Sequence, residues 1–187
     1  MDALLTPNFR AGYLAVFKPR ASKNPDGTMG APKYSVRALF PPGTDLKAMK
    51  EAAKAAAVEK FGEKLPKVMR PPFRLNSDLE NPVQGIGDDW IVMTFSTNAD
   101  NAPGLVDQRN QDIIDEKTIF SGCWFRAQVR PAGYDNAGNK GVSFFLQNLQ
   151  LVKKDEPLGG GRMPANKAFT PVEDASEDGD DPNDMFK

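Results

Sequence analysis

The sequence TIFSGCWFRAQVR at residues 118–130 predicts the central strand of the fold. Its side chains fall into two sets that alternate, as the two faces of a β-strand require. The apolar face consists of Ile119, Cys123, Phe125, Ala127 and Val129, and the other face of Phe120, Trp124, Arg126, Gln128 and Arg130. The apolar set suits a core, which leaves the aromatic and basic set for the surface.

A second long strand is expected directly after the first. The stretch DNAGN at 135–139 has the residues of a hairpin turn and leads into GVSFFLQNLQLVK at 141–153. The apolar residues of this last strand change face after Leu146, which predicts a β-bulge. One of Phe144 and Phe145 should be buried and the other partly exposed, and the pattern leaves open which.

Shorter strands are expected before this hairpin, at 9–18, 34–40 and 89–97, because apolar residues alternate there. In the first of them, one face should carry Phe9, Ala11, Tyr13, Ala15 and Phe17. Five or six strands of this length predict a mainly β fold, a small antiparallel β-barrel, since closure removes exposed strand edges.

One main helix is expected between the second and third of these shorter strands. Thr44 or Asp45 should cap its start, and Gly62 should end it. Its apolar residues follow the helical period and include several alanines, which allow close approach to a sheet.

The composition excludes several classes of site. The 187 residues include no His and a single Cys, Cys123, so a zinc cluster, a Ser–His or Cys–His pair and an internal disulfide are ruled out. The first residues, MDALLTPNFR, lack the basic and apolar regions of a signal peptide, and no stretch is long enough to span a membrane. A soluble protein without a cofactor or a bound metal is expected.

The charge is divided along the chain. Residues 171–187 contain seven acidic residues and one basic residue, a net charge of −6. The whole chain carries −1, so the remainder carries +5. A basic body with an acidic tail is predicted, and the tail has too few apolar residues to fold.

Aromatic and basic residues together predict a surface that binds nucleic acid. Aromatic rings can stack on bases while guanidinium groups neutralise phosphates. The candidates are Arg37, Arg70, Phe73, Arg74, Phe120, Trp124, Arg126, Arg130, Tyr134 and Lys140. An alternative stays open, in which Trp124 packs under a loop and the arginines of its strand are only solvated.

Two other functions compete with this hypothesis. Asp107 and the run Asp115-Glu116-Lys117 have the residue types of a metal-dependent nuclease, in which carboxylates hold magnesium and a lysine assists the attacking water. A small barrel can also be a structural protein of a virion.

Several segments, taken in order, resemble a family of bacteriophage single-stranded DNA-binding proteins. They are YSV at 34–36 followed by Pro41 and the Ala/Lys-rich helix, PGLVD at 103–107, IFSGCWFRA at 119–127, NKGVSF at 139–144 and PLGGGR at 157–162. The resemblance covers most of residues 8–162. It implies an oligonucleotide-binding (OB) barrel over residues 1–162 that coats single strands during phage replication and recombination, without enzymatic activity, in the cytoplasm of the infected bacterial host.

The same resemblance implies a role for residues 163–187, the linker and disordered acidic tail. In such proteins an acidic tail with an aromatic tip recruits replication proteins such as a polymerase, helicase or primase. The residues of this sequence that match are Asp180, Asp181, Asp184, Met185 and Phe186. Lys187 follows Phe186 here, which departs from a terminal phenylalanine. The resemblance leaves a homodimer open.

Overall fold

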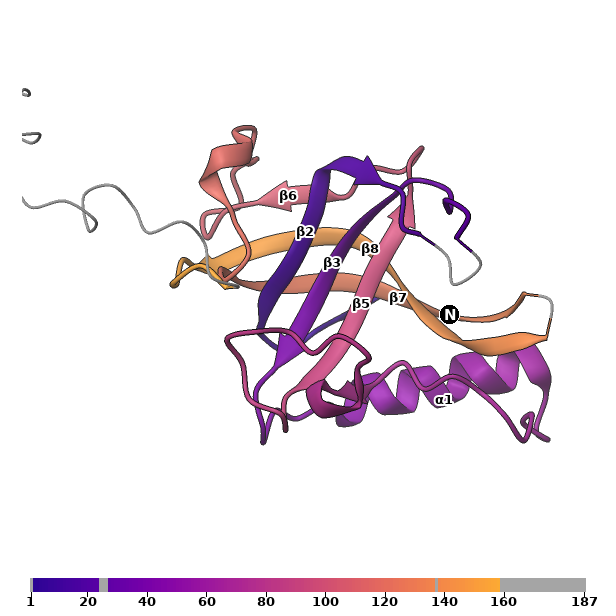
Figure 1. Ribbon diagram of the computed structural model, residues 1–187. Coiled ribbons are helices and arrows are strands. Elements are labelled where there is room, and N and C mark those ends of the chain that lie inside the picture. The colour runs from indigo at the N-terminus through magenta and orange to yellow at the C-terminus, as the bar shows by residue number, and fades with distance from the viewer. Residues whose placement is uncertain (1, 24–26, 137, 159–187) are drawn as a thin grey trace, which may run out of the picture.

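The computed structural model describes residues 2–23, 27–136 and 138–158, and its centre is a closed ring of five strands (Figure 1). The ring runs β2 (Phe9–Arg20), β3 (Lys33–Phe40), β5 (Ile91–Asn98), β8 (Asn139–Lys153) and β7 (Trp124–Asn136), which pairs again with β2. The expected barrel is therefore confirmed. One pair of the ring differs from the antiparallel expectation, because β5 and β8 run parallel at Phe95–Phe144 and Ser96–Phe145; outside the ring, β6 (Gly104–Val106) also runs parallel to β8.

Shorter elements complete the described structure. Three short strands pair with the ring: β1 (Leu4–Leu5) with β7, β4 (Arg74–Leu75) with β5, and β6 (Gly104–Val106) with β8. Two 3-10 turns lie at Asn76–Asp78 and Glu116–Thr118. The described residues contain no helix with the length and apolar character needed to cross a membrane.

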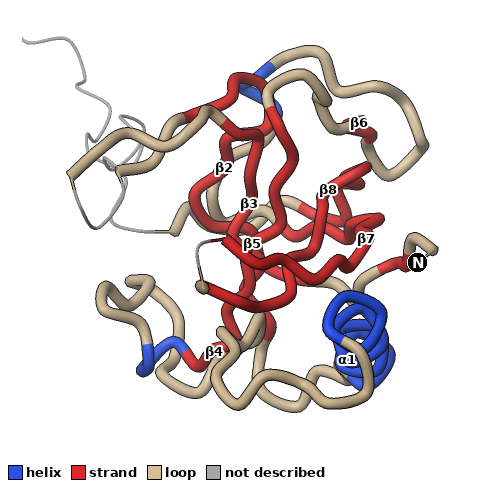
Figure 2. Tube along the Cα trace, turned by 90° about the vertical axis from the view of Figure 1, so that its right-hand side faces the viewer, coloured by secondary structure: helices blue, strands red, loops and turns tan. Residues whose placement is uncertain are grey.

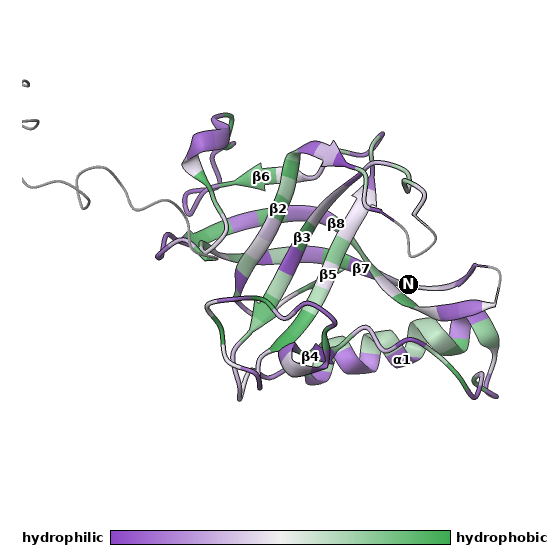
Figure 3. Cartoon of the chain, in the orientation of Figure 1, coloured by the Kyte–Doolittle hydropathy of each residue, from purple (hydrophilic) through white to green (hydrophobic). Residues whose placement is uncertain are grey.

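The hydrophobic core lies inside the ring of strands. Its largest fully buried side chains are Phe9, Phe40, Phe95, Phe125 and Phe144. The ring of Phe9 contacts those of Phe40 and Phe95 edge to face at 5.6 Å, a favourable arrangement for aromatic pairs. Figure 3 shows hydrophobic and hydrophilic residues alternating along the barrel strands, as strands with one buried face require.

The helix α1 (Lys47–Phe61) lies beneath the ring and alongside the end of the β7–β8 hairpin (Figures 1 and 2). Before its first turn, the Asp45 carboxylate accepts a hydrogen bond from the Lys47 amide at 2.9 Å, and Gly62 ends the helix with a φ of 80°. The end at Gly62 was predicted, but the N-cap residue is Leu46, which makes no side-chain cap, and not Thr44 or Asp45; Asp45 bonds the first turn from one residue earlier. The helix buries Met49 and three alanines against the barrel, so the small residues do allow a close approach.

The long hairpin confirms most of its sequence pattern. The predicted apolar face of 118–130 is buried throughout. The predicted bulge occurs where the register shifts between Gln128 and Val129. Phe144 is the buried phenylalanine, at 1% exposure, and Phe145 the exposed one, at 37%.

The start of the first hairpin strand differs from the prediction. The strand begins at Trp124, and residues 116–118 form a 3-10 turn, because the Asp115 carboxylate accepts a hydrogen bond from the Lys117 amide at 2.9 Å. This turn takes Thr118 out of the strand.

Strand β2 contradicts the predicted alternation at one residue. Tyr13 was expected on the face of Phe9 and Ala11, but it is 63% exposed. The register of β2 against β3 shifts between Gly12 and Ala15, and Tyr13 has a φ of 48°. This irregularity turns the tyrosine outward, whereas Ala15 and Val16 are buried.

Candidate nucleic-acid interface

A groove of about 800 Å³ lies between strands β3 and β5 and the far end of the β7–β8 hairpin. It forms because β5 and β8 are paired at only two positions. The segment 70–75 runs between them, since Arg70 bridges to Gly141 in β8 and Arg74 pairs with Val92 in β5. The groove is lined by Arg37, Arg70, Pro71, Pro72, Phe73, Arg74, Asp78, Leu79, Val92, Met93, Thr94, Tyr134, Val142, Ser143 and Phe144.

Five of the ten predicted site residues meet in this groove. Arg37 comes from β3, Arg70, Phe73 and Arg74 from the segment before β5, and Tyr134 from β7. Three guanidinium groups and one carboxylate, that of Asp78, therefore line the groove. Arg74 donates a hydrogen bond to the backbone carbonyl of Asp78, which keeps its guanidinium at the wall. The lining is basic and suited to an anionic chain.

Two of the three aromatic residues that line the groove, Phe73 and Tyr134, were predicted, and both are held by packing. The ring of Phe73 is half-buried and contacts Phe144 edge to face at 6.1 Å. Tyr134 lies opposite Gly141 across the hairpin. A Cβ atom on Gly141 would lie 2.6 Å from the Tyr134 hydroxyl, so glycine leaves the space that this ring occupies.

Lys140 lies beside the groove but does not line it. Its backbone carbonyl accepts a hydrogen bond from the Arg70 amide at 2.8 Å. Its ammonium is 3.4 Å from the Asp135 carboxylate and 5.9 Å from the ring centre of Phe61. Lys140 therefore supports the position of Arg70 through the backbone.

The structure does not bring Trp124 into the groove. Its indole Nε1 donates a hydrogen bond to Asp155 at 2.7 Å, and the Lys153 ammonium lies 5.0 Å from its ring centre. The hydrogen bond from Trp124 and another from the Glu156 amide lower the pKa of Asp155. The ring centre of Trp90 is 6.4 Å from that of Trp124, and neither tryptophan lines the groove.

The three remaining predicted residues also lie elsewhere. Phe120 is half-buried in a separate hollow beside Phe17 and Lys18. Arg126 and Arg130 are exposed on the outer face of β7, where Arg126 donates a hydrogen bond to Gln150 at 2.7 Å. Neither arginine lines the groove, although Tyr134, farther along the same face of β7, does.

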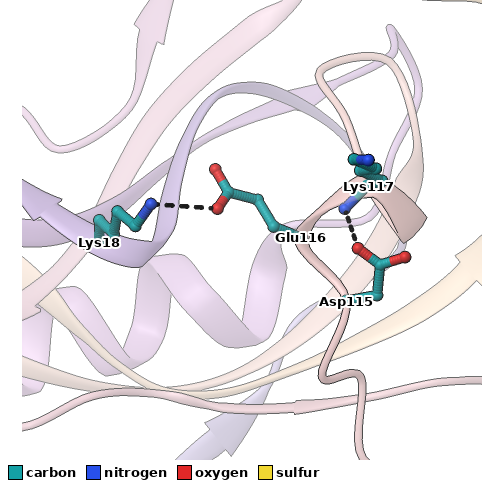
Figure 4. Close-up of polar contacts among 4 residues, drawn as sticks. All are labelled: Lys18, Asp115, Glu116 and Lys117. Carbon is teal, nitrogen blue, oxygen red and sulfur yellow. Dashed lines mark hydrogen bonds and ion pairs between the residues drawn. The ribbon is translucent and has the colours of Figure 1, made fainter.

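The carboxylates of the nuclease alternative bind the backbone and a lysine (Figure 4). Asp115 accepts from the Lys117 amide, and Glu116 lies 3.5 Å from the Lys18 ammonium. Asp107 accepts from the amides of residues 109 and 111 at 2.7 and 2.9 Å. Nowhere in the described ranges do three or more His, Cys, Asp or Glu residues gather in a way that could hold a metal ion. The structure therefore gives this alternative no support.

Sequence reasoning missed Tyr13, whose exposed ring lies 4.5 Å from the guanidinium carbon of Arg37. It also missed Thr94, which lies opposite Arg37 in β5 and lines the groove. Neither carries a sequence signal of its own: Tyr13 follows an alternating pattern that the bulge breaks, and a threonine in a strand is ordinary.

The predicted tail residues Asp180, Asp181, Asp184, Met185 and Phe186, and the domain boundary at 162, lie outside the described residues. The last described residue, Leu158, packs against the apolar cluster of Leu39, Val83 and Val92, and its amide donates to the Ser121 carbonyl at 2.9 Å. Because Val92 also lines the groove, Leu158 lies near one wall of it.

Comparison with known proteins gives consistent matches. The family model described as the single-stranded DNA-binding protein of Enterobacter phage Enc34 matches residues 2–181. A putative protein, p50, of Acyrthosiphon pisum secondary endosymbiont phage 1 is 28% identical over 184 residues, which cover 91% of this chain and 94% of p50.

Among solved structures, the single-stranded DNA-binding protein of bacteriophage Enc34 in complex with single-stranded DNA is similar with a TM-score of 0.68 and 21% identity. The match covers 84% of this chain and 89% of that chain. The single-stranded DNA-binding protein gp2.5 of bacteriophage T7 is similar with a TM-score of 0.53 and 16% identity, over 88% and 98% of the two chains. These likenesses confirm the OB-like fold.

Proposed function

Because the chain belongs to the family of phage single-stranded DNA-binding proteins represented by that of Enterobacter phage Enc34, we propose that the groove between β3, β5 and the β7–β8 hairpin is where it binds a single strand. The observation that carries this proposal is the meeting of Arg37, Arg70 and Arg74 with Phe73 and Tyr134 in one groove. OB barrels bind oligonucleotides on the face of their second and third strands and on the loop between the fourth and fifth. In this ring those elements are β3, β5 and the hairpin end.

The chemistry of the groove suits a single strand without a preferred sequence. Guanidinium groups neutralise phosphates, which every sequence carries, and aromatic rings stack on the π face that every base has. Duplex DNA keeps its bases stacked on each other, so it offers only phosphates to this surface. The protein thereby coats and protects single strands during phage replication and recombination in the cytoplasm of the infected host.

The acidic tail has two proposed roles. Residues 180–186 recruit replication proteins such as a polymerase, helicase or primase, with Met185 and Phe186 as the apolar tip. The tail also competes with DNA, since a segment of charge −6 is tethered to a basic body of charge +5. Deleting residues 171–187 and testing capture of purified replication proteins separates recruitment from simple solubility, and Phe186→Ala tests the tip alone.

A titration with a fluorescently labelled oligonucleotide, with and without magnesium, tests the main proposal. Binding without cleavage supports it, and binding should be much weaker for a duplex of the same length. Cleavage that requires magnesium would support the nuclease alternative. Neither binding nor cleavage would leave the virion structural protein as the surviving hypothesis.

A further inference from the structure

Tyr13 is the most exposed aromatic residue of the described barrel surface, and its backbone is unusual. Its side chain is 63% exposed, and its φ of 48° lies in the left-handed region. A residue with a Cβ atom adopts this region at an energetic cost that glycine does not have. Such conformations gather at functional sites, where the surrounding structure maintains them.

Packing of the ring does not account for the cost of this conformation. Tyr13 is absent from both apolar clusters of the described residues, whereas Phe9 and Ala11 of the same strand are fully buried. The contact of the ring that the structure shows is with Arg37, whose guanidinium carbon lies 4.5 Å over the ring centre. A tyrosine that gains so little burial in a strained conformation has a reason other than core stability.

Arg37 connects this ring to the groove. Its guanidinium covers one side of the Tyr13 ring, and the same side chain lines the groove. Arg37 pairs with Gly12 of β2 on one side and with Thr94 of β5 on the other. Tyr13, Arg37 and Thr94 therefore form a row across three adjacent strands that continues the groove over β2.

From this geometry, and building on the proposed function, we infer that Tyr13 is a base-stacking residue that extends the single-strand site beyond the groove. A base stacks on the open side of the ring, and Arg37, on its other side, neutralises a phosphate of the same strand. The bulge in β2 presents the ring to solvent in a fixed orientation, so less conformational freedom is lost on binding.

Three substitutions at this one position test the inference. Tyr13→Ala and Tyr13→Gly both remove the ring, but only glycine relieves the backbone. Both should weaken oligonucleotide binding by a similar factor of about 5- to 150-fold, the range for one stacked base. Tyr13→Phe should keep wild-type affinity because stacking needs the ring and not the hydroxyl.

The melting temperatures of the same proteins test whether the Tyr13 ring has a structural role. Tyr13→Gly should melt about 2–4 °C above Tyr13→Ala, since glycine has no cost at this φ. If the ring stabilised the fold, Tyr13→Gly would melt below the wild-type protein although its backbone is relieved; without such a role it should melt at or above the wild-type temperature. Ile114→Ala, which removes an 88% exposed apolar side chain outside the groove, is the matched control and should change neither property.

The outcomes distinguish this inference from the function on which it rests. Unmodified protein that fails to bind oligonucleotide would overturn both. Binding by the unmodified protein, with unchanged affinity in Tyr13→Ala and Tyr13→Gly, would overturn the role of Tyr13 alone. An equal loss of affinity in these two variants, with wild-type affinity in Tyr13→Phe, supports the proposed role of Tyr13.

Discussion

Replacing the three groove arginines with glutamine should reduce both the affinity for single-stranded DNA and its dependence on salt. Arg37, Arg70 and Arg74 line one groove, and under the proposed function each contacts one phosphate. Neutralising one phosphate of a single strand contributes about 0.7 to the slope of log affinity against log salt. The triple variant should therefore have a slope smaller by about 2.

The same relation gives the loss of affinity at each salt concentration. If the contribution of a contact vanishes near 1 M salt, one contact is worth about 0.9 decades of affinity at 50 mM and about 0.5 at 200 mM. The triple variant should bind about 500-fold more weakly at 50 mM and about 30-fold more weakly at 200 mM. Arg70→Gln alone should weaken binding about 8-fold at 50 mM salt and about 3-fold at 200 mM.

Fluorescence anisotropy of a labelled oligothymidine, measured from 50 mM to 500 mM salt, provides the assay. The matched control is Arg126→Gln with Arg130→Gln, which removes two exposed arginines from the outer face of β7. Its slope should stay at the wild-type value. If the control pair lowers the slope as much per residue as the groove variant does, phosphates follow β7, and the assignment of the groove is refuted.

Three further predictions concern the tail, the Trp124 contact and the helix. Deleting residues 171–187 should strengthen DNA binding at low salt, and the gain should shrink as the Debye length falls from about 10 Å at 0.1 M to about 3 Å at 1 M; equal affinities at low salt would contradict this. The lowered pKa of Asp155 means that its stabilising contact with Trp124 is fully present above pH 3.8 and is lost as the pH falls through the lower folded value. Tryptophan emission should therefore change on acidification over this range. Asp155→Asn should abolish that change, and a change that persists in the variant would exclude Asp155 as its source. In Gly133→Ala the new Cβ would lie 2.5 Å from the Lys60 Cβ, so urea unfolding should show a loss of about 1–3 kcal/mol, whereas an unchanged midpoint would show that α1 shifts freely.

The strands and the core were predictable because one physical rule governs them. A strand with one buried face must alternate, and Phe125, Ala127 and Val129 do so without interruption. The bulge near Leu146 was equally predictable from the sequence. The apolar residues change face there, and residues on both faces of a strand cannot all reach the core unless the strand has a bulge. Gly62 marked the end of the helix because few residue types serve there, whereas the predicted cap at Thr44 or Asp45 lies one or two residues before the actual N-cap, Leu46.

Two of the three departures arise where local structure is decided by partners far away in the sequence, and the third has a local cause. Tyr13 fits the alternating pattern of β2, and only the register against β3 reveals that the strand bulges there. The parallel pair Phe95–Phe144 depends on how the ring closes, which no single strand records. The 3-10 turn at residues 116–118 replaced part of a predicted strand because a side-chain cap at Asp115 competes with the ladder.

The location of the groove shows why inward and outward faces are not enough to predict a site on a barrel. Alternation correctly placed Arg126 on the outer face of its strand, but a closed ring has several outer sides. Arg37 and Tyr134 share a side because β5 and β8 are not paired before Phe95 and Phe144, and the segment around Phe73 lies in the gap. The residues that meet there are spread from position 37 to 144, so their meeting depends on closure of the ring of strands. A single strand examined alone instead predicts a binding surface on its own aromatic and basic face.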